Sequence, residues 1–154
     1  MFKTEAHKGC YEKVKGYMSE LFGEMFEARE DAPIFIIPMG SAVAHVMVIP
    51  WGDDDAMVCV RAYLVSDVEM TPELMEFLLK ENPTFKFGAF GIDQDGDILF
   101  EHTIVGSTCD KNELKASVLG VLSVADHYDD LIVQRFGGIR MLDRIKQIIL
   151  GGGE

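Results

Sequence analysis

The fold is decided by residues 34–65, which read IFIIPMGSAVAHVMVIPWGDDDAMVCVRAYLV. This stretch holds three apolar runs, at residues 34–37, 42–49 and 57–65, and two segments rich in Pro, Gly, Ser and Asp separate them. Parallel neighbours need a crossover of about a dozen residues or more, so connections this short predict an antiparallel meander.

Both faces of the predicted meander are apolar. The second run shows this most clearly, with Val43, Met47 and Ile49 on one face and Ala44, Val46 and Val48 on the other. An antiparallel sheet with one wet face alternates more cleanly between apolar and polar residues. We therefore expect a cover on both faces, helices on one and a second copy of the chain on the other.

Four residues of the meander are candidate contacts for a protein partner: Trp51, Val46, Val48 and Tyr63. Trp51 is the only tryptophan, and tryptophan is enriched among the residues that dominate binding interfaces. Its alternative role is packing against the end of the sheet.

Apolar spacing and capping residues predict the elements around the meander. These are a helix at 4–29, a short helix after Thr71, a hairpin of 85–92 and 98–105, a long helix from Asp110 to Phe136, and a short terminal helix at 139–149. Strands in groups rather than alternation with helices indicate the α+β class. The predicted order is α-βββ-α-ββ-α with the terminal helix added, a five-stranded, mainly antiparallel sheet with helices on one face.

Size and charge narrow the classes of partner. The 154 residues fit one domain, at 1–150, followed by a frayed Gly-rich tail at 151–154. A net charge of −12 repels nucleic acids and anionic membranes, so we expect neither as a partner. The three cysteines form no C-x-x-C pair, and no secretory segment opens the chain, which favours the reducing cytoplasm.

No stretch of sequence assigns a metal or cofactor site. The most metal-like string is Asp93-Gln94-Asp95-Gly96-Asp97, but its glycine comes fourth and Ile104 stands where an EF-hand loop needs a glutamate. Asp and Gly also suit a hairpin turn, which is our interpretation. The three aspartates at 53–55 read as a solvated loop tip. The four histidines make no chelating pair.

No stretch assigns a catalytic residue either. Cys109 precedes a helix N-terminus, which stabilises a thiolate, but no histidine adjoins it, so we expect a structural cysteine. The acidic segment at 126–130 has a reactive composition, yet on a helix its members fan out around the axis, and we expect a solvated face. Glu101 and His102 should face opposite sides of a strand.

Several short segments carry a family resemblance. Leu78-Leu79-Lys80-Glu81-Asn82, Phe87-Gly88-Ala89-Phe90, Asp95-Gly96-Asp97-Ile98, Glu101-His102-Thr103 and Tyr128-Asp129-Asp130 resemble the YbjN-like family, and most closely its cyanobacterial branch. That family is similar in fold to type III secretion chaperones, which are small, acidic, dimeric α+β proteins. The resemblance implies no catalytic site and implies a chaperone-like module that holds a client segment against apolar surface.

Three functions stay open at this point. The first is a dimeric, chaperone-like protein-binding module without cofactor. The alternative is a regulatory or signal-transduction protein that responds to a small ligand, which requires a closed pocket with a few polar groups. The third is an enzyme, which requires perturbed acids or histidines meeting in a cleft, for example around His102.

Overall fold

The sheet is the centre of the structure, a computed structural model that describes residues 1–151. Its strands are β1 (Glu27–Ala28), β2 (Ile34–Met39), β3 (Ala42–Trp51), β4 (Asp55–Ser66), β5 (Ala89–Ile92), β6 (Ile98–Val105) and β7 (Ile139–Arg140). The helices are α1 (Glu5–Phe22), α2 (Pro72–Glu81), α3 (Lys111–Phe136) and α4 (Met141–Gly151), with 3-10 turns at Asn82–Thr84 and Gly106–Thr108.

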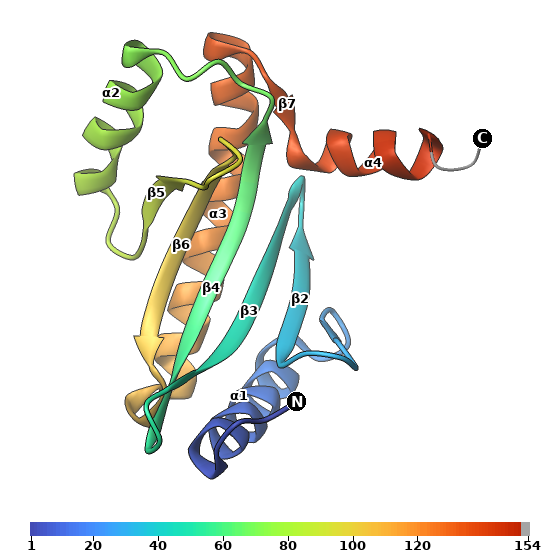
Figure 1. Cartoon of the computed structure of the whole chain (residues 1–154), viewed down its shortest axis with the longest axis vertical. Helices are drawn as coiled ribbons and strands as arrows, with labels where there is room; N and C mark the ends of the chain where they lie inside the picture. The colour runs from blue at the N-terminus through green and yellow to red at the C-terminus, as the bar shows by residue number, and fades with distance from the viewer. Residues whose placement is uncertain (152–154) are drawn as a thin grey trace.

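The strands lie in the order β1-β2-β3-β4-β6-β5, and β7 pairs with β4 (Figure 1). Each pair is antiparallel, which confirms the meander and the α+β class. The predicted number of five strands was too low. β1 and β7 were missed because two residues are too few to show any alternation.

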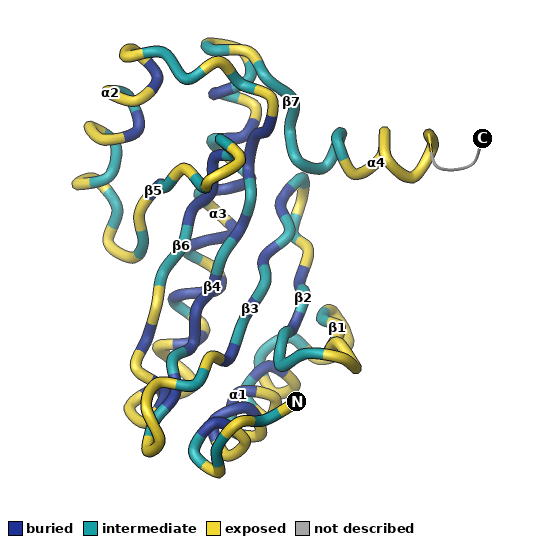
Figure 2. Tube along the Cα trace, viewed as in Figure 1, coloured by how far each residue is buried: buried dark blue, intermediate teal, exposed yellow. Residues whose placement is uncertain are grey.

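Helices α1 and α3 cover one face of the sheet, as predicted, and lie behind it in Figure 1. Tyr11 of α1 stacks on Phe35 of β2, with ring centroids 5.0 Å apart. α2 packs against the far end of α3, where Phe77 lies 5.4 Å from the ring of Phe136. Along β3 and β4, buried and half-buried residues largely alternate (Figure 2), so the core lies between this face and the helices.

The first helix is shorter than predicted. It ends at Phe22, because Gly23 takes a φ of 60° that stops the helix and its N–H bonds to the carbonyl of Ser19. Phe26, which continues the apolar stripe of the helix in sequence, instead sets its ring edge-on to Phe35, with the centroids 5.7 Å apart.

The chain ends in α4, which stands away from the body of the molecule (Figure 1). Gly137 and Gly138, both with φ of 86°, end α3 and turn the chain toward it. Of the predicted frayed tail, Gly151 is the last residue of α4, and 152–154 lie outside the described residues. Among residues 1–151, no helix has both the length and the apolar character that a membrane crossing requires.

Candidate functional site

At one edge of the sheet, the outer side of β6 has a partner along only half of the strand. β5 pairs with β6 from Ile92↔Ile98 to Ala89↔Glu101. Beyond that point, residues 102–105 of β6 pair with β4 alone among the described residues. We call these four residues the free edge of β6, and they form the lower left margin of the sheet in Figure 1.

The hydrogen bonds of β5 reveal which backbone groups point outward at this edge. Asn82 engages both backbone groups of Phe90, accepting from its N–H at 2.7 Å and donating to its carbonyl at 3.4 Å. The backbone groups of Phe90 therefore point away from β6. Those of its neighbour Ala89 point toward β6, where Ala89 pairs with Glu101, so the backbone groups of Glu101 point toward β5. Alternation then directs the N–H and C=O groups of Thr103 and Val105 outward, beyond the end of β5.

Three of these four groups face the free edge without a protein partner among the described residues. The carbonyl of Val105 accepts from the Thr108 hydroxyl at 3.4 Å, within the turn that follows β6. The N–H and C=O of Thr103 and the N–H of Val105 remain. An exposed strand edge of this kind is a template for pairing with another extended chain.

A groove of about 540 Å³ runs beside the free edge, and we call it the edge groove. Its lining residues are Phe87, His102, Thr103, Ile104, Val105, Thr108, Asn112, Glu113 and Ala116. Most of this lining is apolar, and α3 supplies the polar residues Asn112 and Glu113. The groove is open to solvent along its length, so it suits a segment of chain better than an enclosed ligand.

His102 braces the floor of the edge groove. Its Nδ1 hydrogen-bonds the hydroxyl of Ser117 on α3 at 2.9 Å, and its ring meets that of Phe87 edge-on at 5.6 Å. Burial lowers the pKa of His102 below its usual 6.5 and favours the neutral ring. Glu101, the next residue, lies on the other face, where it pairs with Arg61 at 2.6 Å. The predicted split of the two side chains is thus confirmed.

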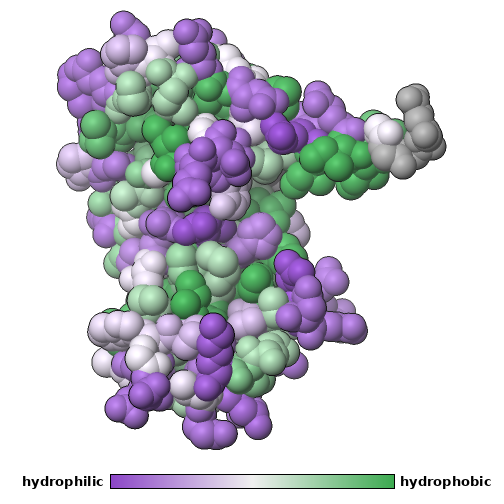
Figure 3. All heavy atoms as spheres, in the orientation of Figure 1, coloured by the Kyte–Doolittle hydropathy of each residue, from purple (hydrophilic) through white to green (hydrophobic). Residues whose placement is uncertain are grey.

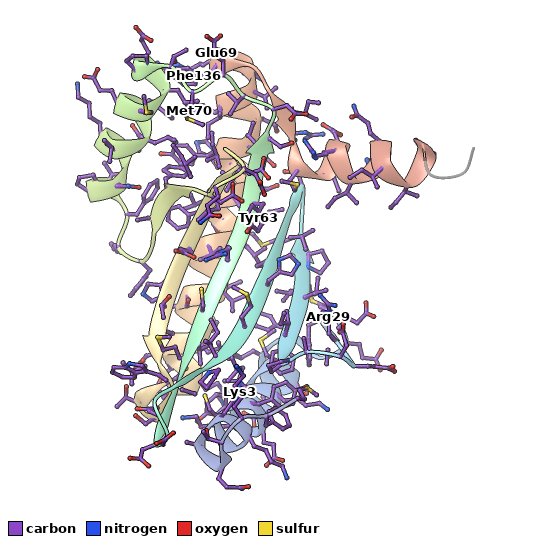
Figure 4. The ribbon with its side chains drawn as sticks, in the orientation of Figure 1. Lys3, Arg29, Tyr63, Glu69, Met70 and Phe136 are labelled. Carbon is purple, nitrogen blue, oxygen red and sulfur yellow. The ribbon has the colours of Figure 1, made fainter. Side chains whose placement is uncertain are left out.

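The face of the sheet away from α1 and α3 is the second candidate surface. We call it the open face, and its side chains include Ile36, Val43, His45, Met47, Met57, Arg61, Tyr63 and Glu101. All eight are half-buried. Figure 4 shows Tyr63 on β4, in the upper half of the sheet, and Figure 3 shows the mixed apolar and polar surface of this side.

A second groove, of about 340 Å³, lies where α4 begins, and we call it the root groove. The open face contributes Val43, His45 and Tyr63, the start of α4 contributes Met141, Leu142 and Ile145, and Ser41, Asp93, Asp95 and Asp97 complete the lining. Burial, followed by the charge of Asp93, raises the pKa of Asp97. The root groove therefore combines an apolar floor with an acidic rim.

The structure divides the four predicted contact residues between two environments. Tyr63 lies on the open face, and Trp51 is exposed at the end of β3. Val46 and Val48 were assigned wrongly as contacts, since both are buried on the helix side. His7 of α1 even donates to the carbonyl of Val48, at 2.8 Å. Both faces of β3 are apolar, so composition did not distinguish the covered face.

The candidates for chemistry take structural roles. Asp93 closes the β5–β6 turn by accepting from the N–H groups of Asp95 and Asp97, at 3.0 and 2.9 Å. Cys109 is buried, and burial raises its pKa to about 11, which disfavours the thiolate. Within residues 1–151, no cluster of three His, Cys, Asp or Glu side chains could hold a metal ion.

The interpretation of 126–130 as a solvated face was wrong. Asp129 is buried and shares the single hydroxyl proton of Ser41 with Asp126, at 2.6 and 2.9 Å, while Asp126 also accepts from the Ser41 N–H. Tyr128 donates to Glu81 at 2.6 Å, and burial together with that carboxylate raises its pKa to about 12. These bonds fasten α3 to the β2–β3 turn and to α2.

Sequence reasoning missed Thr103, Val105 and Phe87. The predicted hairpin gave β5 the same length as β6, which left no free edge. The signal was present in Gly88, whose φ of 91° ends the pairing before Phe87 reaches the sheet.

Comparison with known families places the chain beside one group of chaperones. The model of the family described as T3SS (YopN, CesT) and YbjN peptide-binding chaperone 1 matches residues 10–144, most of the chain. It confirms the resemblance to YbjN-like proteins and the secretion-chaperone type of fold. It does not separate branches of the family, so the cyanobacterial likeness stays a prediction. A search of curated proteins finds no match.

Proposed function

Because the chain belongs to this family of peptide-binding chaperones, we propose that it holds an extended segment of a client protein along the free edge of β6. The single observation that carries the proposal is the set of outward backbone groups at Thr103 and Val105, beside the edge groove. In this mode of recognition, main-chain hydrogen bonds supply affinity and alternate side chains find pockets.

The lining of the edge groove supports a particular kind of segment. Side chains of an added strand alternate between the two faces, so every second one would lie toward α3 and the apolar groove. Phe87 and Ile104 favour apolar side chains there, and Glu113 favours a basic neighbour. The net charge of −12 attracts basic segments over a longer range. We therefore propose clients that alternate apolar with polar or basic residues.

Two further features belong to the proposal. The first is a homodimer, whose interface is argued below. The second is a reducing compartment such as the cytoplasm, supported by three cysteines that are free and buried in the structure.

Peptide binding tests the proposal directly. The probe is a fluorescein-labelled peptide, Lys-Val-Thr-Val-Thr-Val-Lys, read by fluorescence anisotropy. Its matched control carries N-methyl groups on alternate residues, which remove the donors of one strand edge and leave the side chains unchanged. We expect saturable binding of the first peptide and at least tenfold weaker binding of the control, since several main-chain hydrogen bonds are lost. Equal affinity for the two peptides would contradict pairing at the strand edge.

A further inference from the structure

Helix α4 presents an apolar surface that its own chain does not cover. None of its eleven residues is buried, and Ile148, Ile149 and Leu150 near its end are 64%, 69% and 79% exposed. Leu142, Ile145 and Ile149 recur at spacings of three and four, which places them on one side of the helix. Figure 3 shows this apolar side along the projecting arm.

Ion pairs fix the root of α4 and leave its tip without such anchors in the described residues. Arg140 bonds Asp130 at 3.0 Å and Asp143 at 2.8 Å, and Arg144 bonds Asp67 at 3.0 Å. The direction of the arm is therefore set at its root. Isolated helices shorter than about 12–15 residues are marginal in water, so a helix of this length needs a packing partner.

The root groove of the same chain is the matching surface. It has an apolar floor, formed by Val43, Tyr63 and the first turn of α4. An eleven-residue helix is about 16 Å long, enough to bring its tip to the root of a second arm that lies antiparallel to it. Each chain thus carries one tip and one groove that its own tip does not reach, since the arm points away from the sheet (Figure 1).

We propose that two copies of the chain exchange these arms, with the tip of α4 from one copy seated in the root groove of the other. The inference names the interface of the homodimer proposed above. In a two-fold dimer the contact of tip with groove occurs twice, so both tips and both root grooves are covered and none is left over to bind a third chain. A client segment would cover the groove and leave the arm exposed, which favours a second copy as the occupant.

Charge supports the same occupant. Two chains of −12 repel one another at long range, so an interface that brings opposite charges together is favoured. Asp143, Arg144 and Lys146 leave α4 with one net positive charge. The rim of the root groove carries Asp93, Asp95 and Asp97, and Lys146 enters the partner's groove region with the tip. The exchange therefore places a cation of each chain near three carboxylates of the other.

Sedimentation equilibrium of the full chain, with paired variants, tests the exchange. The unaltered chain should have twice the mass of 17.2 kDa at micromolar concentration. The arm variant Ile148→Asp with Ile149→Asp should raise the dissociation constant about ten-thousandfold, because two isoleucines are removed from each of the two tip contacts, at roughly tenfold for each. The matched control is Leu79→Asp on α2, a leucine that is 70% exposed, and it should leave the dissociation constant unchanged.

Mixing distinguishes an exchange of arms from a dimer through another surface. The groove variant Val43→Asp should also be monomeric alone. A mixture of arm variant and groove variant retains one good tip and one good groove, so a heterodimer should form. An unaltered chain that is monomeric, an arm variant whose dimer persists, or a mixture that stays monomeric would each overturn the exchange.

Two further measurements keep the result interpretable. Circular dichroism confirms the fold of each variant, and if Val43→Asp unfolds, the arm variant and its Leu79 control decide the question by themselves. Binding of the labelled peptide is measured on the same samples. If the unaltered chain is monomeric and binds the peptide, only the proposed arm exchange is refuted. If it is dimeric and does not bind the peptide, only the proposed binding of a client at the free edge of β6 is refuted.

Discussion

Replacing Thr103 by proline should weaken client binding and spare the fold. Proline removes the backbone N–H, and at Thr103 this group points away from β4, so no bond within the sheet is lost. Edge strands tolerate proline for this reason. The matched control is Thr103→Val, which removes the same hydroxyl but keeps the N–H and a strand-favouring side chain.

The size of the effect follows from the groups at the free edge. A main-chain hydrogen bond contributes about 0.5–1.5 kcal/mol net, which is roughly a 2- to 13-fold change in affinity. The proline ring also stands where the backbone of the added strand would lie, so pairing on both sides of Thr103 is disturbed. We therefore expect the dissociation constant of the labelled peptide to rise at least about tenfold relative to Thr103→Val.

Fluorescence anisotropy measures the affinity, and thermal unfolding measures the fold. The melting temperatures of Thr103→Pro and Thr103→Val should agree within about 4 °C, which corresponds to roughly 1–2 kcal/mol in a chain of this size. Two variants with the same fold and affinities within twofold would refute the assignment of the Thr103 N–H to the client.

Three further predictions concern the packing and the buried groups of the fold. Gly138→Ala should lower the free energy of unfolding by about 1–3 kcal/mol or more, because φ is 86° there and an added Cβ would come within 2.9 Å of the β4 backbone. The control is Gly137→Ala, which has the same φ but open space around the added Cβ, and it should lower the free energy of unfolding by less. Urea denaturation measures both. Ser41→Ala should cost about 1–3 kcal/mol at pH 7, because Asp129 loses its donor. Burial raises the pKa of Asp129, so this cost should shrink as the pH falls and the carboxylate protonates, and a cost that grows on acidification would contradict it. Since burial raises the pKa of Cys109 from 9.0 to about 11, iodoacetamide should label it at least about a hundredfold more slowly than an exposed thiol, by mass spectrometry of the folded chain.

The sheet could be predicted because its signals are local. Short turn segments between apolar runs leave an antiparallel meander as the simple solution, and β2, β3 and β4 follow it closely. The caps at Thr71 and Asp110 placed α2 and α3 in the same way, and both side chains accept the expected N–H groups, those of Leu74 and Glu113.

The site could not be predicted because it depends on relations between distant segments. Val46 and Met47 are equally apolar, and only the docking of α1 and α3 decides that Val46 is buried. The free edge of β6 arises from a mismatch in length between two strands, which Gly88 sets through its backbone conformation. The periodicity of α4 predicted a helix but not its direction, which the ion pairs of Arg140 and Arg144 set.

Amide hydrogen exchange, followed by NMR with and without the labelled peptide, tests most directly whether a client binds at the free edge of β6. The N–H groups of His102 and Ile104 point toward β4 and should exchange slowly in both states. Those of Thr103 and Val105 should exchange rapidly in the free chain and slow at least about tenfold when the peptide is bound. If the peptide binds but exchange at Thr103 and Val105 is unchanged, the peptide lies on another surface, and the proposal of binding at the free edge of β6 is contradicted.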